Sequence, residues 1–326
     1  MMRRSNKNPI ITRQDIQSDN PALSDVSSVF NPGAVRINGK TNLLMRVQNR
    51  GRETYLVRAD SFDGFSFNVD PNPTPVAGLE ILEETIYHVY DPRITNIGSH
   101  LYVTLAVDTD DGCRTILTRG ENLSSLEYIG LMWDSDARNG VLFPEKIGGR
   151  YMGLVRPNVA ADPNQPVSGS EIWLVESSDL REWRPVKPIM SGRPHYWDEL
   201  IGSGPPPVKT KDGWLHVYHG VATHFMSANI YQAGVCLLDL EDPSVVIARS
   251  RYNILEPRED YELIGQVPNV VFPTGMVVDT SESDSFAPPD SNVIIYYGAA
   301  DTVVAAVVTT IGELLGFSCR SGAPCS

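Results

Sequence analysis

Short apolar runs, interrupted by Gly, Asn and Asp, dominate the chain, and the periodicity of amphipathic helices is almost absent. The runs are rich in Val, Ile, Tyr and Leu, which are typical of strands. Turn-forming segments stand between them, each followed by an apolar run: INGK at 37–40, NIGS at 96–99, IGGR at 147–150 and TKDG at 210–213. This pattern predicts consecutive β-hairpins and an all-β protein.

A longer repeat organises these hairpins. A segment that contains proline recurs at intervals of about fifty to seventy residues: FNPGAV at 30–35, YDPRIT at 90–95, LFPEKI at 142–147, GPPPVK at 204–209 and FPTGMV at 272–277. Four of these segments are followed by a turn, a core strand and a second strand. The fifth reaches its next strand, VIIYYGAAD, through a longer polar loop. This interval is typical of four-stranded propeller blades, whereas a β-sandwich does not explain the recurring proline.

We therefore predict an all-β fold with a single five-bladed β-propeller. The propeller is expected at 30–318, between an N-terminal arm at 1–29 and a C-terminal tail at 319–326. The arm is expected to help close the ring or to pack on a partner. The innermost strand of each blade lines the central channel of a propeller, so the proline segments should converge at one end of it. The expected group is Asn31, Asp91, Glu145, Gly204 and Thr274. A funnel lined by such groups is a natural site for a small molecule.

Charge and composition narrow the function. The chain has 326 residues and a net charge of −13, which argues against binding to nucleic acid or to an anionic membrane. No apolar run approaches the ~20 residues of a membrane-spanning helix, and the start of the chain does not resemble a secretory signal. The four cysteines have no metal-ligand spacing. We expect a cytoplasmic protein without a metal; a homo-oligomer remains open, because the arm can reach a neighbour.

Asp91 is the first candidate for chemistry. Alone, an Asp before Pro92 is more often a turn residue. Its expected place on an innermost strand favours a working acid, because polar groups there face a shared cavity.

Arginines near two of the repeats are the second candidate. Arg46, Arg50 and Arg52 surround the first hairpin, and Arg138 and Arg156 flank the third segment. A surface ion pair is the usual role of a single Arg. Several that converge would suit an oxyanion such as phosphate, or a polyhydroxylated ligand.

Two further candidates have balanced interpretations. His219 ends the apolar run LHVYHGV and is either a buried structural imidazole or a site residue, while His216 alternates with it and His224 is expected in a loop. Asp301 closes the strand YYGAAD, where a turn role and a hydroxyl-binding role are equally compatible with the sequence.

The segment HYWDELIGSGPPP, at 195–207, holds the last candidates. Asp198 and Glu199 are most simply a solvated pair, and Trp197 is either a sugar platform or part of the core. GSG at 202–204 is too short to indicate a phosphate loop, and the chain has neither a metal-binding His pair nor a nucleophile elbow. We expect no cofactor.

Together, the segments FNPGAV, LLMRV, YDPRIT, LFPEKIGGRYMGLVRP, GSGPPPVKTKDGWLHVYHGV, LLDLEDP and VPNVVFPTGMV resemble glycoside hydrolase family 130, in order from about residue 8 to residue 315. The resemblance implies a five-bladed propeller that acts on β-D-mannosides with inversion. Most characterised members of that family are phosphorylases, which use inorganic phosphate as co-substrate and release α-mannose 1-phosphate. A smaller group hydrolyses β-1,2-mannosidic linkages.

The resemblance also implies roles for individual residues. Asp91 matches the proton donor, whose proton is thought to reach the glycosidic oxygen through the 3-hydroxyl of the mannose. The positions implied to hold the sugar are Asn31, Arg46, Arg52, Tyr90, Asn139 and Asp301. The positions implied to line the phosphate site, or a water site in a hydrolase, are Arg138, Arg156, His219 and Tyr231.

One departure from the family pattern affects the expected reaction. Phosphorylases of the family usually have Lys in a pattern like W-x-x-L-K-I-G, whereas Leu200 takes that position here, next to Glu199. A carboxylate near phosphate would repel it by roughly one to a few kcal/mol. An inverting hydrolase needs a second carboxylate as general base, so this departure slightly favours hydrolysis with Glu199 as base. The alternative is phosphorolysis, which the arginines favour. A non-catalytic sugar-binding propeller is a remote third possibility, because it would not need Asp91.

Overall fold

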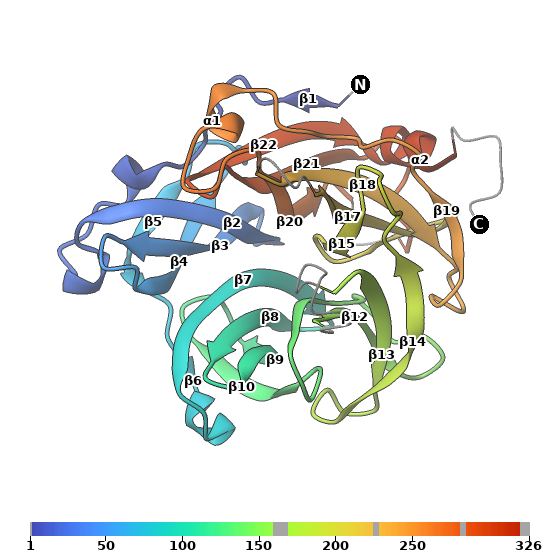
Figure 1. The fold of residues 1–326 in the computed structure, drawn as a ribbon, viewed down its shortest axis with the longest axis horizontal. Helices are drawn as coiled ribbons and strands as arrows, with labels where there is room; N and C mark the ends of the chain where they lie inside the picture. The colour runs from blue at the N-terminus through green and yellow to red at the C-terminus, as the bar shows by residue number, and fades with distance from the viewer. Residues whose placement is uncertain (1, 159–168, 224–227, 281–284, 320–326) are drawn as a thin grey trace.

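The structure is a computed structural model that describes residues 2–158, 169–223, 228–280 and 285–319. Its strands form five sheets arranged around a common centre (Figure 1). The prediction of a five-bladed β-propeller is confirmed, and each sheet is one blade.

The first three blades follow the chain order. Blade 1 contains β2 (Val26–Ile37), β3 (Lys40–Asn49), β4 (Thr54–Ser61) and β5 (Asn68–Pro73). Blade 2 contains β7 (Ile86–Ile97), β8 (His100–Thr109), β9 (Gly112–Gly120), β10 (Leu126–Leu131) and the short β6 (Val76–Ala77), parallel to β10. Blade 3 contains β11 (Ala137–Leu142), β12 (Tyr151–Pro157), β13 (Glu171–Ser177) and β14 (Trp183–Ser191).

The described α-helices lie in the second half of the chain: one connects blades 4 and 5, and the other follows the last strand of blade 5. Blade 4 contains β15 (Leu200–Ser203), β16 (Val208–Thr210), β17 (Gly213–Ala222), β18 (Ile230–Leu238) and β19 (Val246–Arg249). Blade 5 contains β20 (Val271–Val278), β21 (Asn292–Ala299), β22 (Val303–Thr310) and β1 (Arg3–Arg4). The two α-helices are α1 (Asp260–Leu263) and α2 (Ile311–Cys319). None of the described helices is long and apolar enough to cross a membrane.

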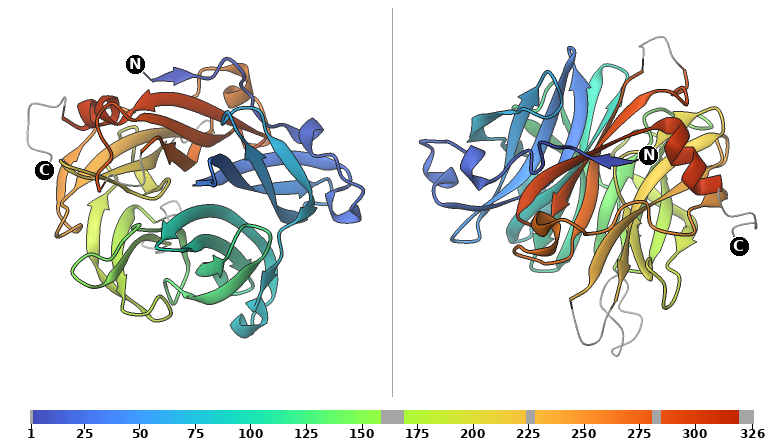
Figure 2. Two further views of the ribbon diagram at one scale, coloured as in Figure 1. Left: turned by 180° about the vertical axis from the view of Figure 1, so that it is seen from behind. Right: turned by 90° about the horizontal axis from the view of Figure 1, so that it is seen from above.

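The start of the chain closes the ring. Blade 5 takes its outermost strand from β1, where Arg3 pairs with Val308 of β22. Figure 2 shows β1 along the edge of this blade, so that the first and last blades lie side by side. The Arg4 guanidinium donates to both carboxylate oxygens of the fully buried Glu262, at 2.7 and 2.8 Å, which anchors the strand.

Two boundaries differ from the prediction. Strand β2 begins at Val26, before the expected end of the arm at residue 29. Helix α2 ends at Cys319, the first residue of the expected tail, and residues 320–326 lie outside the described residues.

All four predicted hairpin turns are present. For example, Ile37 pairs with Lys40 across Asn38 and Gly39, which both have positive φ, as this tight turn requires. Apolar side chains pack between every pair of neighbouring blades. Phe143 of blade 3 and Trp214 of blade 4, for instance, meet edge to face with centroids 5.2 Å apart. The core is therefore a ring of five interfaces around the channel.

A β-bulge in the innermost strand marks the site. The register with the neighbouring strand shifts between Val29 and Pro32 in β2, between Tyr90 and Arg93 in β7, between Arg138 and Val141 in β11, and between Pro273 and Gly275 in β20. The inserted residues include Asn31, Asp91, Asn139 and Thr274. Bulges redirect side chains and are common next to active sites.

The prediction that Glu145 joins this group is wrong. The segment 142–147 follows the innermost strand β11 instead of opening it, so Asn139 takes the equivalent place. Glu145 is exposed and forms an ion pair with Lys209, with 2.5 Å between Glu145 Oε1 and Lys209 Nζ. Both residues line a second cavity of about 400 Å³, at the far ends of the innermost strands.

Candidate active site

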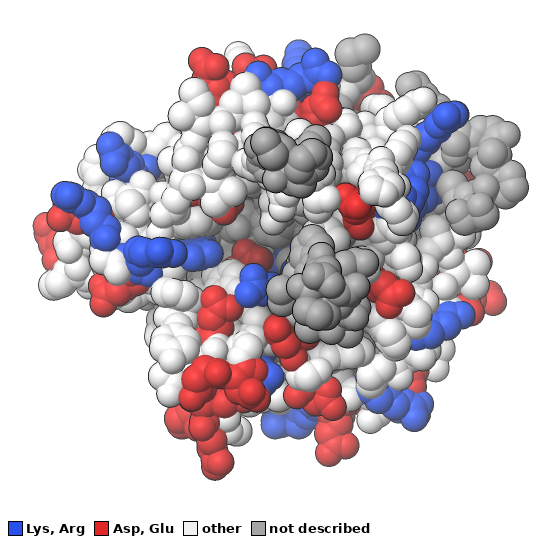
Figure 3. Space-filling view, viewed as in Figure 1, with Lys and Arg blue, Asp and Glu red and all other residues white. Residues whose placement is uncertain are grey.

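A cavity of about 220 Å³ opens at the bulged ends of the innermost strands. Its lining comes from all five blades and the segment before β20: Phe30, Asn31, Arg46, Tyr90, Asp91, Arg138, Asn139, Arg156, His219, Tyr231, Val267, Val270, Phe272 and Asp301. Acidic and basic side chains meet near the middle of the face in Figure 3. Ten of these residues are among the twelve predicted site residues; Glu199 and Arg52 are not in the lining.

Asp91 lies on the bulge of β7 with φ of +54°, a conformation that is uncommon for a residue with a side chain. It is buried, with 8% of its surface exposed. The fully buried Arg93 donates to the carbonyl oxygen of Asp91 at 2.9 Å and to those of Gly204 and Ser203 at 3.0 and 3.2 Å. Arg93 therefore ties the bulge to blade 4, and its Nη1 lies 4.0 Å from the Asp91 carboxylate. Gly204 thus serves the site through its backbone.

Asp301 is the second carboxylate of the cavity. It lies in the turn between β21 and β22, where it and Ala300 have φ of +49° and +45°. Burial and the neighbouring charge of Asp91 raise the pKa of Asp301 to about 6, while Arg46 opposes the shift. The cavity thus holds one carboxyl group, that of Asp301, whose pKa is shifted toward neutral, as is common in acid–base sites.

Arg46 and Tyr90 form one wall. The Arg46 guanidinium lies over the rings of Phe30 and Tyr90, at 4.2 and 4.9 Å from their centroids, and its Nε has no hydrogen-bond partner among the described residues. Beside this wall, the buried Asn31 donates to Thr274 at 3.2 Å. The flat stacked guanidinium and the amide can donate to sugar hydroxyl groups.

Arg138 and Arg156 form a second wall, and the Arg138 guanidinium lies 5.9 Å from the centroid of the Tyr90 ring. The two arginines are paired residues of the antiparallel strands β11 and β12, so their side chains start side by side. Burial, followed by the charge of Arg138, lowers the pKa of Arg156. Neither Nε has a hydrogen-bond partner within the described ranges. Two adjacent guanidinium groups with free donors are a site for an anion.

His219 completes this anion site. Burial, followed by the charges of Arg156 and Arg93, lowers its pKa well below the ordinary value, so the imidazole is neutral. Its ring packs edge to face on Phe272, with centroids 4.6 Å apart, and stacks on Tyr231 at 6.3 Å. Its Nδ1 has no partner in the described part of the chain. His216 is fully buried on the same strand and does not line the cavity.

Gly202 allows His219 and Asn139 to approach each other. A Cβ at Gly202 would lie 2.4 Å from the His219 ring and 2.5 Å from Asn139 Oδ1. From the sequence, we considered GSG only as a possible phosphate loop and assigned it no packing role. Its glycines are needed for close packing at the cavity, a role that the sequence does not display.

The apolar part of the lining was also missed. Phe30 and Phe272 belong to the proline segments but precede their polar residues, and Val267 and Val270 come from the loop before β20. Apolar surface beside convergent polar groups is typical of ligand pockets.

Glu199 and Arg52 lie elsewhere. Glu199 accepts a hydrogen bond from the Thr223 hydroxyl, which is the main cause of its lowered pKa, and its other oxygen lies 3.5 Å from the backbone nitrogen of His195. Arg52 is exposed in the turn between β3 and β4 with φ of +67°.

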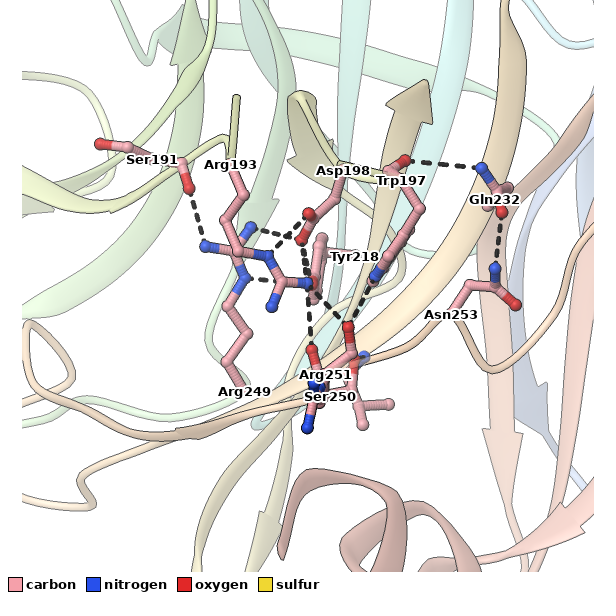
Figure 4. A network of polar contacts seen from close by, with 11 residues as sticks. Ser191, Arg193, Trp197, Asp198, Tyr218, Gln232, Arg249, Ser250, Arg251 and Asn253 are labelled. Carbon is pink, nitrogen blue, oxygen red and sulfur yellow. Dashed lines mark hydrogen bonds and ion pairs between the residues drawn. The ribbon is translucent and has the colours of Figure 1, made fainter. Parts of the chain in front are cut away.

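The neighbouring Asp198 is not the solvated residue that we expected. It is fully buried and accepts bonds from Arg193 at 2.8 Å through both oxygens, from Arg249 at 2.6 Å and from the Tyr218 hydroxyl at 2.8 Å (Figure 4). Trp197 stacks on Tyr218, with centroids 5.7 Å apart, which places it in the core of blade 4 and not on a sugar. This network fixes the segment before β15.

The remaining candidates from the sequence add no residue to the described part of the site. His224 lies outside the described residues. Among the described residues, no group of His, Cys, Asp and Glu could hold a metal ion.

Comparison with known proteins identifies the family. The profile of glycoside hydrolase family 130, described as beta-1,4-mannooligosaccharide phosphorylase, matches residues 1–320. A 1,2-beta-oligomannan phosphorylase from Thermoanaerobacter sp. is 35% identical over 316 residues, with 91% of this chain and 97% of the relative covered. A beta-1,2-mannobiose phosphorylase from Listeria innocua is 33% identical over 263 residues, with 80% and 68% covered. The solved structure of a Listeria innocua beta-1,2-mannobiose phosphorylase with beta-1,2-mannobiose has a TM-score of 0.82 at 28% identity, with 97% of this chain and 99% of that chain covered. The chain belongs to glycoside hydrolase family 130.

Proposed function

We propose that this protein is a β-mannoside phosphorylase, which cleaves its substrate with inorganic phosphate and releases α-mannose 1-phosphate. The observation that carries this proposal is the adjacent pair Arg138 and Arg156, whose Nε atoms have no hydrogen-bond partner among the described residues although they are buried. Buried donors are nearly always satisfied, so a ligand is the natural acceptor. Phosphate offers several charged oxygens to two guanidinium groups and the neutral His219.

Hydrolysis, which the sequence slightly favoured, is not supported. The proposed base Glu199 does not line the cavity, and its carboxylate is engaged by Thr223. The carboxylates that do line it are Asp91 and Asp301, and the curated relatives named above are phosphorylases. Leu200 at the position of the family lysine leaves Arg138 and Arg156 as the cations for phosphate.

In the proposed reaction, a phosphate oxygen attacks C1 of the mannosyl group on the face opposite to the leaving sugar. The bond between C1 and the glycosidic oxygen breaks as the new C1–O–P bond forms, so the configuration changes from β to α. Asp91 supplies the proton that the leaving oxygen takes up, through the 3-hydroxyl of the mannose. Arg46, Asn31, Asn139 and Asp301 would hold the mannosyl group, while Arg138, Arg156, His219 and Tyr231 would surround the phosphate.

For the substrate we propose a β-1,2-linked oligomannoside. Relatives at 35% and 33% identity are named for β-1,2 linkages, and the family profile is named for β-1,4 linkages. The structure describes only part of the loop between β12 and β13, so the identity of the leaving sugar rests on these relatives.

Product analysis tests both parts of the proposal. The protein is incubated with β-1,2-mannobiose or with β-1,4-mannosyl-glucose, with and without inorganic phosphate. We expect mannose 1-phosphate to form from β-1,2-mannobiose only when phosphate is present. Free mannose as the sole product, formed at the same rate with and without phosphate, would establish hydrolysis and overturn the proposal. Faster cleavage of the β-1,4 substrate would overturn the linkage and leave the reaction intact.

A further inference from the structure

Asp108 contacts two residues of the cavity without lining it. It lies near the end of β8, with 32% of its side chain exposed. The Tyr90 hydroxyl donates to Asp108 Oδ1 at 2.6 Å, and Arg138 Nη2 lies 3.5 Å from the same oxygen. Tyr90 belongs to blade 2 and Arg138 to blade 3. A single carboxylate oxygen therefore connects the two walls of the cavity.

The Tyr90 ring, which belongs to the first wall, contacts one guanidinium group of each wall. The Arg46 guanidinium lies 4.9 Å from its centroid and that of Arg138 lies 5.9 Å from it. Burial raises the pKa of Tyr90, so the phenol stays protonated and donates to Asp108. The hydrogen bond to Asp108 holds the tip of the Tyr90 side chain in place, and both guanidinium groups pack against its ring.

The contribution of Asp108 is better explained by geometry than by stability. Ion pairs between partly exposed groups add little to folding stability, and the Asp108–Arg138 pair is of this kind. The long Arg138 side chain has no other ion pair within the described ranges, and its Nε has no partner there. An anchor that holds such a side chain in one orientation lowers the entropy cost of binding an anion.

We propose that Asp108 is a positioning residue that holds Arg138 in the orientation required for phosphate. Through Tyr90, it also aligns the phosphate wall, formed by Arg138 and Arg156, with the sugar wall, formed by Arg46 and Tyr90. This inference rests on the proposed function, because it takes Arg138 as a phosphate ligand. Asp108 itself touches neither substrate.

The test compares Asp108→Asn and Asp108→Glu with the wild type. The Asn side chain keeps an oxygen that accepts from Tyr90 but loses the charge that holds Arg138. We expect the KM for phosphate of Asp108→Asn to rise by about tenfold. The KM for β-1,2-mannobiose should change by less than about twofold, since Tyr90 keeps its acceptor. Asp108→Glu should restore most of the phosphate affinity, a rescue that a merely structural role would not produce.

Asp60→Asn is the matched control. Asp60 is on β4, has 35% of its side chain exposed and pairs with Lys40 at 2.8 Å, but it lies outside the cavity. This variant should leave both KM values unchanged, and its melting temperature calibrates the loss of one partly exposed ion pair.

Several outcomes would overturn the inference. One is a KM for phosphate in Asp108→Asn that equals the value of the control. A lower KM would mean that Asp108 competes with phosphate for Arg138. An equal rise in both KM values without rescue by Glu would indicate a general structural defect. If wild-type turnover needs no phosphate, the proposed function itself fails, whereas phosphate-dependent wild-type turnover with an unaffected Asp108→Asn variant rejects the role of Asp108 alone.

Discussion

The two mouths of the central channel are built by the same innermost strands but treat charge differently. One mouth lies where β2, β7 and β20 end, and Arg36, Asn96 and Val278 of these strands are in its lining. The charged side chains in this lining are Arg36, Glu145 and Lys209, and all three are in ion pairs. At the other mouth, the bulges of these strands begin a cavity in which the Nε atoms of three arginines have no partner among the described residues.

Backbone conformation separates the mouths in the same way. Asp91, Asn139 and Asp301 line the first cavity with positive φ, whereas no described non-glycine residue that lines the second cavity has positive φ. Strain and unsatisfied donors lower stability, and they are usually retained where function requires them. The comparison teaches that the bulged mouth keeps cationic donors for a ligand, while the charged side chains in the lining of the other mouth are already paired.

The largest expected effect comes from the acid at the bulged mouth. Asp91→Asn keeps the shape of the residue but cannot supply a proton, so kcat should fall by about 10²- to 10⁴-fold. Binding of β-1,2-mannobiose, measured by calorimetry, should persist. Glu145→Gln at the other mouth is the control and should keep full activity. Unchanged turnover in Asp91→Asn would contradict the role of this carboxylate.

The phosphate wall should show the next largest effect. Arg156→Met removes a guanidinium from the anion site, and the KM for phosphate should rise by about 10- to 100-fold, which corresponds to the loss of a charged hydrogen bond. Arg36→Met at the other mouth removes a cation that already has an acceptor and should leave this KM unchanged. Equal effects of the two substitutions would erase the distinction between the mouths.

The pH dependence of the free energy of unfolding should show how much a charged Asp301 in the cavity destabilises the fold. The pKa of Asp301 is raised to about 6, so the folded protein binds more protons than the unfolded chain between about pH 4 and pH 6. The free energy of unfolding should therefore fall as pH rises through this window. Asp301→Asn removes this loss and should be more stable than the wild type well above pH 6 by about 3 kcal/mol, with little gain near pH 4.

Denaturant titrations at pH 4.5, 6 and 7.5 measure this difference. Asp279→Asn, in the ion pair with Arg36 near the other mouth, is the control and should show no such gain above pH 6. A destabilised Asp301→Asn variant at pH 7.5 would mean that the charge of Asp301 stabilises the fold. The same variant should bind the mannoside more weakly if Asp301 accepts from a sugar hydroxyl.

Glu199 should have the smallest effect. Since its side chain lies outside the cavity and bonds to Thr223, Glu199→Gln should change kcat for phosphorolysis by less than about threefold. A loss as large as that of Asp91→Asn would show that Glu199 reaches the substrate during turnover and would revive hydrolysis.

The sequence predicted the blades well because strand and turn residues act locally. Ten of the predicted residues line the cavity; Asn31 and Asp91 came from the repeated proline segments, whereas Asn139 and Tyr231 came only from the family resemblance. The proline repeat misled us in blade 3, where it selected Glu145, because the innermost strand ARNGVL has no proline and its site end is marked by a bulge. Register shifts depend on pairing between strands, and a single sequence does not display them.

The sequence also did not predict the residues whose role depends on contacts with distant parts of the chain. Arg93 fastens carbonyl groups more than a hundred positions away, and Asp108 meets Arg138 from another blade. Asp198 and Glu199 are adjacent in sequence, yet one is fully buried in a network and the other only half-buried at its edge. Burial of this kind follows from packing around the ring.

Equilibrium binding of phosphate is the most direct test of the account. Calorimetry on the Asp91→Asn variant, which should bind without turnover, is compared with the same variant that also carries Arg138→Met and Arg156→Met. The account predicts one saturable phosphate site in the first protein and none in the second, with Arg36→Met and Lys209→Met as neutral controls in the Asp91→Asn background. No phosphate binding in the first protein, or equal binding after loss of both arginines, would contradict the claim that the bulged mouth is the phosphate site.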